Sequence, residues 1–215
     1  MRFSKIIPAC VLALALGLGG CGSDDPVTPP ISPADQGSGT ALHNAMRKLW
    51  EDHITWTRLF IVSDVAGLPD RGPTVARLLA NQEDIGAAIK PYYGEAAGDQ
   101  LTGLLNRHIL TAADLLAAAK AGNTAGTEAA STRWYANADS IAAFLNGANP
   151  QNWPLGHMRQ MMKDHLDLTL EEAVARLQGD YQADIAAYDK VHEEILLMAD
   201  MLTEGIIAQF PDQAR

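Results

Sequence analysis

The sequence predicts an all-α fold: an up-and-down helical bundle of five long helices, with a short helical pair inserted after the first. Apolar residues recur at intervals of three and four from Thr40 onward, and no stretch alternates as a β-strand does. Alanine and leucine dominate the same region, as is typical of helices. The turns at Gly122-Asn123 and Gly179-Asp180 are so short that the helices on either side should form antiparallel hairpins.

The helices follow one another in a clear order. The first should run from about Thr40 to Ala66 and end at Gly67-Leu68-Pro69. The short pair follows, with Pro73 in the first turn of one helix and Asn81 as the N-cap of the next, which stops near Pro91. The remaining long helices should cover about 96–121, 124–145, 154–177 and 181–209, and each ends close to a Gly or Pro.

Residues 1–20 have the features of a bacterial lipoprotein signal peptide. Arg2 and Lys5 precede an apolar run that is too short to be a good membrane span. The run ends in Leu-Gly-Gly-Cys, which resembles a lipobox, and the resemblance implies that Cys21 becomes the lipidated first residue. The alternative is an ordinary secretory peptide with an incidental cysteine.

The lipobox resemblance also predicts the location of the protein. Gly22 follows the cysteine in place of an aspartate, which favours the outer membrane, facing the periplasm or the cell surface, if the cell is Gram-negative. Residues 21–39 are rich in Pro, Ser, Gly and Asp and should form a disordered linker. Residues 40–215 then form one helical domain, attached to the cell envelope by the lipid on Cys21.

Charge and motifs exclude several classes of function. The formal net charge is −10, and no basic stripe is present, so a nucleic-acid partner is not expected. The chain has no Gly-rich phosphate loop, no Gly-x-Ser-x-Gly and no cysteine nucleophile, which argues against kinases, hydrolases and dinucleotide enzymes. No sequence feature identifies a protein partner.

Four of the long helices carry a histidine on the apolar face. Each histidine lies about a dozen residues from the start of its helix, or roughly 18 Å along the axis at 1.5 Å per residue. The four imidazoles are therefore predicted to meet in one layer of the core, where a metal ion would satisfy their nitrogens. They are His53, His108, His165 and His192.

Other polar residues could complete such a site. Asp189 precedes His192 by three residues and should share its face, so it is predicted to add a carboxylate ligand. Threonines that follow a histidine by three or four residues could orient the imidazole rings, and an amide on the fourth long helix could reach the same layer. These second-shell candidates are Thr57, Thr111, Thr169 and Asn137.

The ligand types leave the cofactor open. Imidazoles with one carboxylate suit a transition metal such as Cu, Zn, Fe or Ni. Met158, Met161 and Met162 near His165 favour copper, although methionines at helical spacing usually fill a core. Two histidines could instead hold a non-covalent haem, whereas the absence of Cys-x-x-Cys-His excludes a c-type haem. The paired Glu-x-x-His motifs of di-iron bundles are also absent.

Several segments resemble a widespread family of small bacterial all-helical proteins. The resemblance rests on LWEDHITWTR, on ARLLANQEDIG with IKPYYG, on RWYANADSIAAFL and on DKVHEEILLMADMLTEGIIAQFP. It covers nearly all of 42–211 and implies one intact domain. Many members of that family lack the lipobox, so the export signal is an addition to the family pattern. The resemblance implies no particular activity.

The sequence therefore favours a lipid-anchored helical bundle that binds a metal ion or haem for storage, delivery or sensing. No separate acid, base or nucleophile can be assigned, so catalysis is not the first expectation. One alternative is a binding or scaffolding lipoprotein in which the histidine layer is purely structural. Another is a redox enzyme that uses the same site with an open coordination position.

Overall fold

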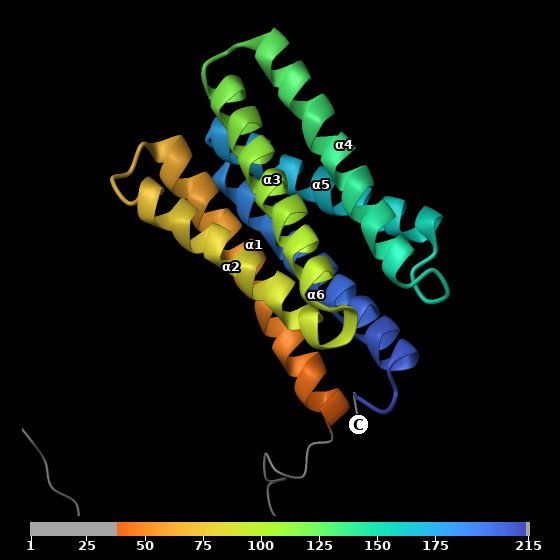
Figure 1. Ribbon diagram of the computed structural model, residues 1–215. Helices are drawn as coiled ribbons and strands as arrows, with labels where there is room; N and C mark the ends of the chain where they lie inside the picture. Colours follow the sequence, from red (N-terminus) through yellow and green to blue (C-terminus); the bar gives the residue numbers. More distant parts are fainter. Residues whose placement is uncertain (1–37, 214–215) are drawn as a thin grey trace, which may run out of the picture. The chain divides into compact units, whose positions relative to one another are not determined.

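The computed structural model describes residues 38–213, which form six long α-helices and no β-strand. Figure 1 shows the helices lying roughly antiparallel to their neighbours. The all-α prediction is confirmed. The signal peptide, Cys21 and nearly all of the predicted linker lie outside the described residues. The helices are α1 (Ser38–Ala66), α2 (Arg71–Tyr93), α3 (Glu95–Lys120), α4 (Thr124–Ala148), α5 (Leu155–Gln178) and α6 (Tyr181–Gln209).

The six helices form a closed ring. Each helix packs against the next in the chain, α6 packs back against α1, and α5 also reaches α1. Short connections enforce the alternating directions: Gly94 alone separates α2 from α3, and Gly179-Asp180 separate α5 from α6. Both glycines have a positive φ, of 85° and 74°, which other residues rarely adopt. None of the described helices combines the length and apolarity that a membrane crossing requires.

The predicted pair of short helices is wrong, because α2 is one continuous helix from Arg71 to Tyr93. Asn81 was expected to cap a helix start, yet it lies mid-helix and fully buried, where its Nδ2 donates to the Leu49 carbonyl at 3.0 Å. Gln82 is also fully buried. The polar run Asn-Gln-Glu-Asp imitates a helix start, but its first two residues make hydrogen bonds inside the core. Tertiary contacts therefore override the local signal.

The other predicted helix boundaries agree with the structure to within a few residues. Local caps explain two of the starts: the side chain of Asn123 accepts from Gly126 N, and that of Asp180 accepts from Ala183 N, both at 3.0 Å. At the other end of α5, Gly179 adopts the left-handed conformation that closes many helices.

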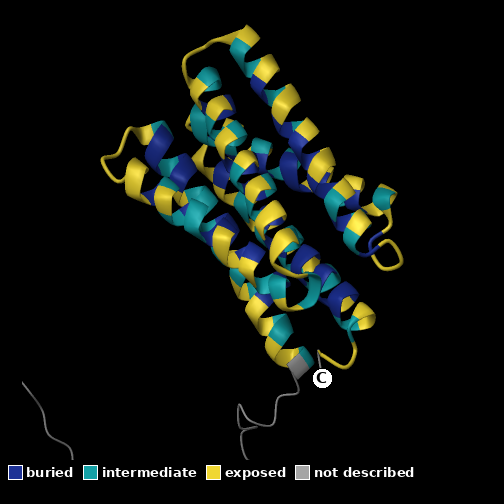
Figure 2. Cartoon of the chain, viewed as in Figure 1, coloured by how far each residue is buried: buried dark blue, intermediate teal, exposed yellow. Residues whose placement is uncertain are grey.

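Buried residues form stripes that face the centre of the ring (Figure 2). The larger apolar cluster includes all three buried tryptophans, Trp50, Trp134 and Trp153, and draws on every helix. A smaller cluster around Phe60 and Leu116 lies further along the same helices. The residues of the smaller cluster on α1 and α3 all follow the histidine of their helix in sequence.

Candidate metal centre

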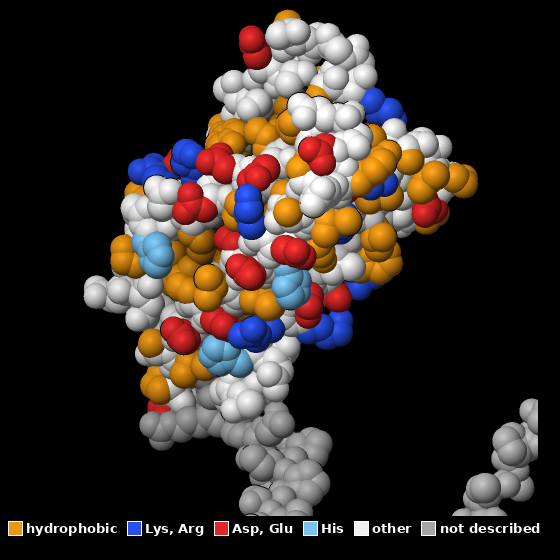
Figure 3. Space-filling view, turned by 180° about the vertical axis from the view of Figure 1, so that it is seen from behind, with side chains coloured by type: hydrophobic (Ala, Val, Ile, Leu, Met, Phe, Trp, Pro, Cys, Tyr) orange, Lys and Arg blue, Asp and Glu red, His pale blue; other side chains and the backbone are white. Residues whose placement is uncertain are grey.

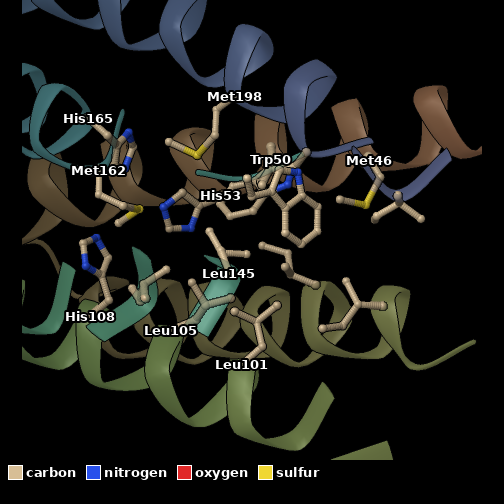
Figure 4. A pocket seen from close by; sticks show the side chains of 16 residues that line it. Met46, Trp50, His53, Leu101, Leu105, His108, Leu145, Met162, His165 and Met198 are labelled. Atoms are coloured by element: carbon tan, nitrogen blue, oxygen red, sulfur yellow. The ribbon is translucent and has the colours of Figure 1, made fainter. Parts of the chain in front are cut away.

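Three buried histidines converge in the middle of the bundle. His53, His108 and His165 come from α1, α3 and α5, which alternate around the ring, and each is at most 4% exposed. One ring nitrogen of each lies within 4.8 Å of the corresponding nitrogens of the other two. Figure 4 shows the three rings at one end of an internal cavity. This arrangement could hold a metal ion.

The triangle of imidazoles is nearly regular. The ring centroids are 5.8 Å apart for His53–His165, 6.2 Å for His108–His165 and 6.4 Å for His53–His108. Three nitrogens bound to one tetrahedral ion at about 2.0 Å would lie about 3.3 Å from one another. The rings would therefore have to close by roughly 1 to 1.5 Å to bind an ion, which side-chain rotation can supply.

The space beside the three rings is small and apolar. The cavity has a volume of about 30 Å³, and its wall includes Trp50, Leu105, Met162 and Met198. Figure 4 shows the thioethers of Met162 and Met198 beside the imidazoles. Such a cavity has room for an ion or a water molecule but not for a porphyrin ring.

A carboxylate fixes the orientation of one ring. His165 Nδ1 lies 2.9 Å from Oε2 of Glu194, on α6, so Nδ1–H donates to the carboxylate and Nε2 is left free. A carboxylate–histidine pair of this kind orients many metal ligands and raises their basicity. Glu194 is not among the residues predicted for the site. The only feature that marks it in the sequence is that it precedes Met198, on an apolar helix face, by four residues.

Gln82 has the corresponding place beside His53. Its Nε2 lies 3.2 Å from His53 Nδ1 and also donates to the Leu78 carbonyl at 2.8 Å. This contact makes Nδ1 an acceptor and places the imidazole proton on Nε2. A metal bound at Nε2 requires the opposite tautomer of His53, with the proton on Nδ1. The amide of Gln82 would then turn its Oε1 toward the ring. This oxygen has no hydrogen-bond partner among the described residues.

Burial keeps two of the imidazoles neutral. It lowers the pKa of His108 to about 3, and the nearby His165 contributes in the same direction. Burial, followed by the neighbouring His165 and His108, also lowers the pKa of His53 well below its ordinary value. At neutral pH both rings therefore keep an unprotonated nitrogen, which a metal ligand requires.

The structure places two of the predicted ligands away from this group. His192 lies on α6 with its side chain 35% exposed, and its Nε2 is 2.8 Å from Oε1 of Glu51. Asp189 is exposed. The buried face in the first half of α6 instead carries Ala187 and Val191, each one residue before a predicted core position. A shift of one residue turns a side chain by about 100° around a helix.

The hydroxyls of the three predicted threonines donate to main-chain carbonyls and not to imidazole nitrogens. Thr57 and Thr169 each donate to the main-chain carbonyl of the histidine four residues earlier, at 2.8 Å. Thr111 donates to the carbonyls of Arg107 and His108, at 2.8 and 3.1 Å. Threonines inside helices often bond back to the preceding turn in this way, so the spacing alone was misleading.

Asn137 does reach the polar layer from α4. It is buried, and its Nδ2 donates to the Leu104 carbonyl at 3.1 Å. The Asn137 carboxamide raises the pKa of His108, whereas burial lowers it. No hydrogen bond of ordinary geometry joins the two side chains. Among the described residues, His108 Nδ1 and Asn137 Oδ1 both lack a hydrogen-bond partner.

A second buried polar cluster lies about two helical turns from His165. Arg58 bridges Glu172 at 2.7 Å and Asp184 at 2.8 Å, and Arg176 reaches Asp184 at 3.2 Å. Glu172 shares the helix of His165, but its carboxylate is bound by Arg58 and does not belong to the histidine group. Burial raises the pKa of Glu172 to about 7, against the effect of Arg58. This cluster ties α1, α5 and α6 together.

Comparisons of the chain with protein-family models, with curated proteins and with solved structures gave no match. The fold and the site therefore define the class of protein on their own: a six-helix bundle with a three-histidine cluster in its core.

Proposed function

We propose that this protein binds one transition metal ion through His53, His108 and His165, and stores, delivers or senses that metal. The observation that supports the proposal is the convergence of three buried imidazoles with one nitrogen each inside 4.8 Å. Cu, Zn, Fe and Ni all accept imidazole ligands. Haem, the other predicted cofactor, does not fit a cavity of about 30 Å³.

The contacts favour a metal centre over a purely structural histidine layer. Within the described part of the chain, no hydrogen bond joins two of the three imidazoles, and His108 Nδ1 has no partner. A buried polar nitrogen without a partner costs about 1–3 kcal/mol. Three imidazoles that only filled the core would therefore be less favourable than apolar side chains of similar size. A metal ion supplies the missing interaction for one nitrogen of each ring.

The proposal includes attachment to the cell envelope. Leu18-Gly19-Gly20-Cys21 resembles a lipobox, and a lipid on Cys21 would hold the helical domain at a membrane. The net charge of −10 gives the protein surface little attraction for anionic lipids, so the lipid itself is the anchor.

Metal analysis of the untagged full-length protein, extracted from the cell envelope, tests the proposal. We expect close to one metal ion per chain in the wild type and in His192→Ala, whose histidine lies outside the centre. His108→Ala and His165→Ala should lose the metal while circular dichroism still shows a folded helical protein. Equal metal content in all four proteins, or none in the wild type even after added Cu, Zn, Fe and Ni, would refute the proposal.

A further inference from the structure

A surface groove lies next to the three-histidine centre. It runs between α5 and α6 and has a volume of about 340 Å³. Figure 3 shows the side of the domain behind that of Figure 1, where acidic and hydrophobic side chains lie beside one another with histidines among them. The groove is lined by thioethers, carboxylates and one imidazole: Met161, Met198, Met201, Asp164, Glu194 and His157.

Two lining residues connect the groove to the centre. Met198 borders both the groove and the internal cavity that the three imidazoles line. Glu194 borders the groove and also accepts the hydrogen bond from His165 Nδ1. Its side chain is 16% exposed, so the carboxylate faces solvent on one side and the centre on the other. Met198 and Glu194 thus each contact both sides, the groove and the group of imidazoles or its cavity.

The remaining groove residues follow one another at regular intervals along α5 and α6. On α5, His157, Met161 and His165 follow one another at intervals of four residues, or about 6 Å each. On the antiparallel α6, the His165–Glu194 contact sets the register, which places Met198 level with Met161. Met201 then lies about one helical turn further along α6, away from His165. Thioethers therefore accompany the imidazoles from the surface to the core.

We propose that this groove is the route by which copper(I) reaches the centre, and that copper(I) is the ion the centre holds. The inference rests on the proposed function and names its metal. Thioethers are soft ligands that select copper(I) over zinc(II), iron(II) and nickel(II). They bind it weakly enough to pass it on to imidazoles. The carboxylates of Asp164 and Glu194 attract a cation to the groove.

The charge of the centre supports a monovalent ion. The electrostatic cost of burying an ion rises with the square of its charge, so a divalent ion costs about four times as much as a monovalent one. The cavity wall beside the three imidazoles is almost wholly apolar. The nearest carboxylate is that of Glu194, and one negative charge balances one positive charge.

The rate of metal uptake tests the route. The variant is Met161→Leu with Met201→Leu, at two half-buried positions where leucine keeps the shape and removes sulfur. The control is Met46→Leu, on the cavity wall away from the histidines in Figure 4. With copper(I) transferred from a chromogenic chelator to the full chain, we expect the double variant to load at least tenfold more slowly. Its equilibrium affinity and the loading rate of the control should stay within threefold of wild type. Uptake at the wild-type rate in the double variant would overturn the route.

A second measurement separates failure of the route from failure of the centre. Titration of the full chain with silver(I), followed by NMR of ¹³C-methyl methionine, should shift the Met161 and Met201 methyls in both wild type and His108→Ala. In the wild type, groove shifts without metal in the centre would refute the proposed function, whereas a loaded centre without groove shifts would refute the route alone. Tighter binding of zinc(II) than of copper(I) would overturn the choice of metal.

Discussion

Single side chains decide the chemistry of the centre. Glu194 determines which nitrogen of His165 is free, and Gln82 contacts the ring of His53 from α2. Neither residue carries a metal-binding pattern in the sequence, since both are ordinary polar residues on amphipathic helices. Their roles follow from the neighbours that the fold brings to them.

Removal of the Glu194 charge should weaken metal binding. In Glu194→Gln, the amide can accept from His165 Nδ1 but no longer balances the charge of the ion. We expect a loss of affinity of about 10- to 100-fold, as is usual when the partner of a histidine ligand is changed. Competition with a chelator of known affinity measures it. Glu193→Gln, at an exposed position next to it, is the control and should bind as wild type does.

His108 should make the metal-free protein less stable when the pH falls below about 6.5. The unfolded chain protonates His108 near that pH, whereas burial holds the folded pKa at about 3. Because the unfolded state binds the additional proton between these two values, the free energy of unfolding decreases with falling pH. At pH 5 the loss from His108 is about 2 kcal/mol.

Urea unfolding of metal-free wild type and His108→Gln at pH 7 and pH 5 measures this contribution. The variant should show a pH dependence that is smaller by about 2 kcal/mol. Glu172 acts in the opposite direction, because its folded pKa is raised to about 7 and the folded state takes up its proton first. That contribution is the same in both proteins and cancels in the comparison. An equal pH dependence in the two proteins would contradict the account of His108.

At the scale of the helices, two glycines allow a close backbone contact between α2 and α3. Gly86 on α2 and Gly98 on α3 meet so closely that a Cβ on Gly86 would lie 2.7 Å from the Gly98 carbonyl oxygen, and one on Gly98 would lie 2.6 Å from that of Gly86. The two backbones can approach because neither residue has a side chain. This contact holds α2 against α3 along the wall of the histidine cavity.

A methyl group at this contact should separate the two helices. Gly86→Ala places Cβ against main-chain atoms that cannot rotate away, so we expect a destabilisation of about 1–3 kcal/mol. Gly103→Ala, on the exposed face of α3 with open space around it, is the matched control. It should leave stability unchanged or raise it by up to about 1 kcal/mol through helix propensity. Thermal unfolding of both variants measures these changes in stability. A Gly86→Ala protein more stable than wild type would contradict the close contact.

At the scale of the whole molecule, the closed ring of helices makes the three-histidine cluster a property of the folded state. The three proposed ligands come from α1, α3 and α5, which are brought together when the ring forms. An ion that binds the folded but not the unfolded chain stabilises the domain by an amount that grows with the logarithm of the free ion concentration divided by the dissociation constant. Metal content and thermal stability should therefore change together.

Metal loading should raise the melting temperature. At free copper(I) about 100 times the dissociation constant, linkage gives about 2.7 kcal/mol, or roughly 5–10 °C for a domain of this size. Calorimetry with a copper(I) buffer measures the shift, with His192→Ala as the control that keeps it. His165→Ala should melt at the same temperature with and without copper. A shift of wild-type size in His165→Ala would place the ion elsewhere.

The sequence by itself determined the class of fold and most helix boundaries. Glycines, prolines and caps such as Asn123 and Asp180 act within a few residues, so their effect can be read locally. The apolar stripes also identified His53, His108 and His165 as core residues, which the structure confirms. Their role as metal ligands stays a prediction.

Only the tertiary structure decided which polar residues face the centre. His192 and Asp189 are predicted to face it, but the buried face in the first half of α6 lies one residue earlier, and hydrophobic periodicity does not resolve a helix face more finely than that. Asn81 and Gln82 were read as a helix start because their burial depends on α1, which is distant in sequence. Glu194 gained its place because α6 packs antiparallel to α5 at the level of His165. Contacts between distant segments arise from packing, and no local pattern encodes them.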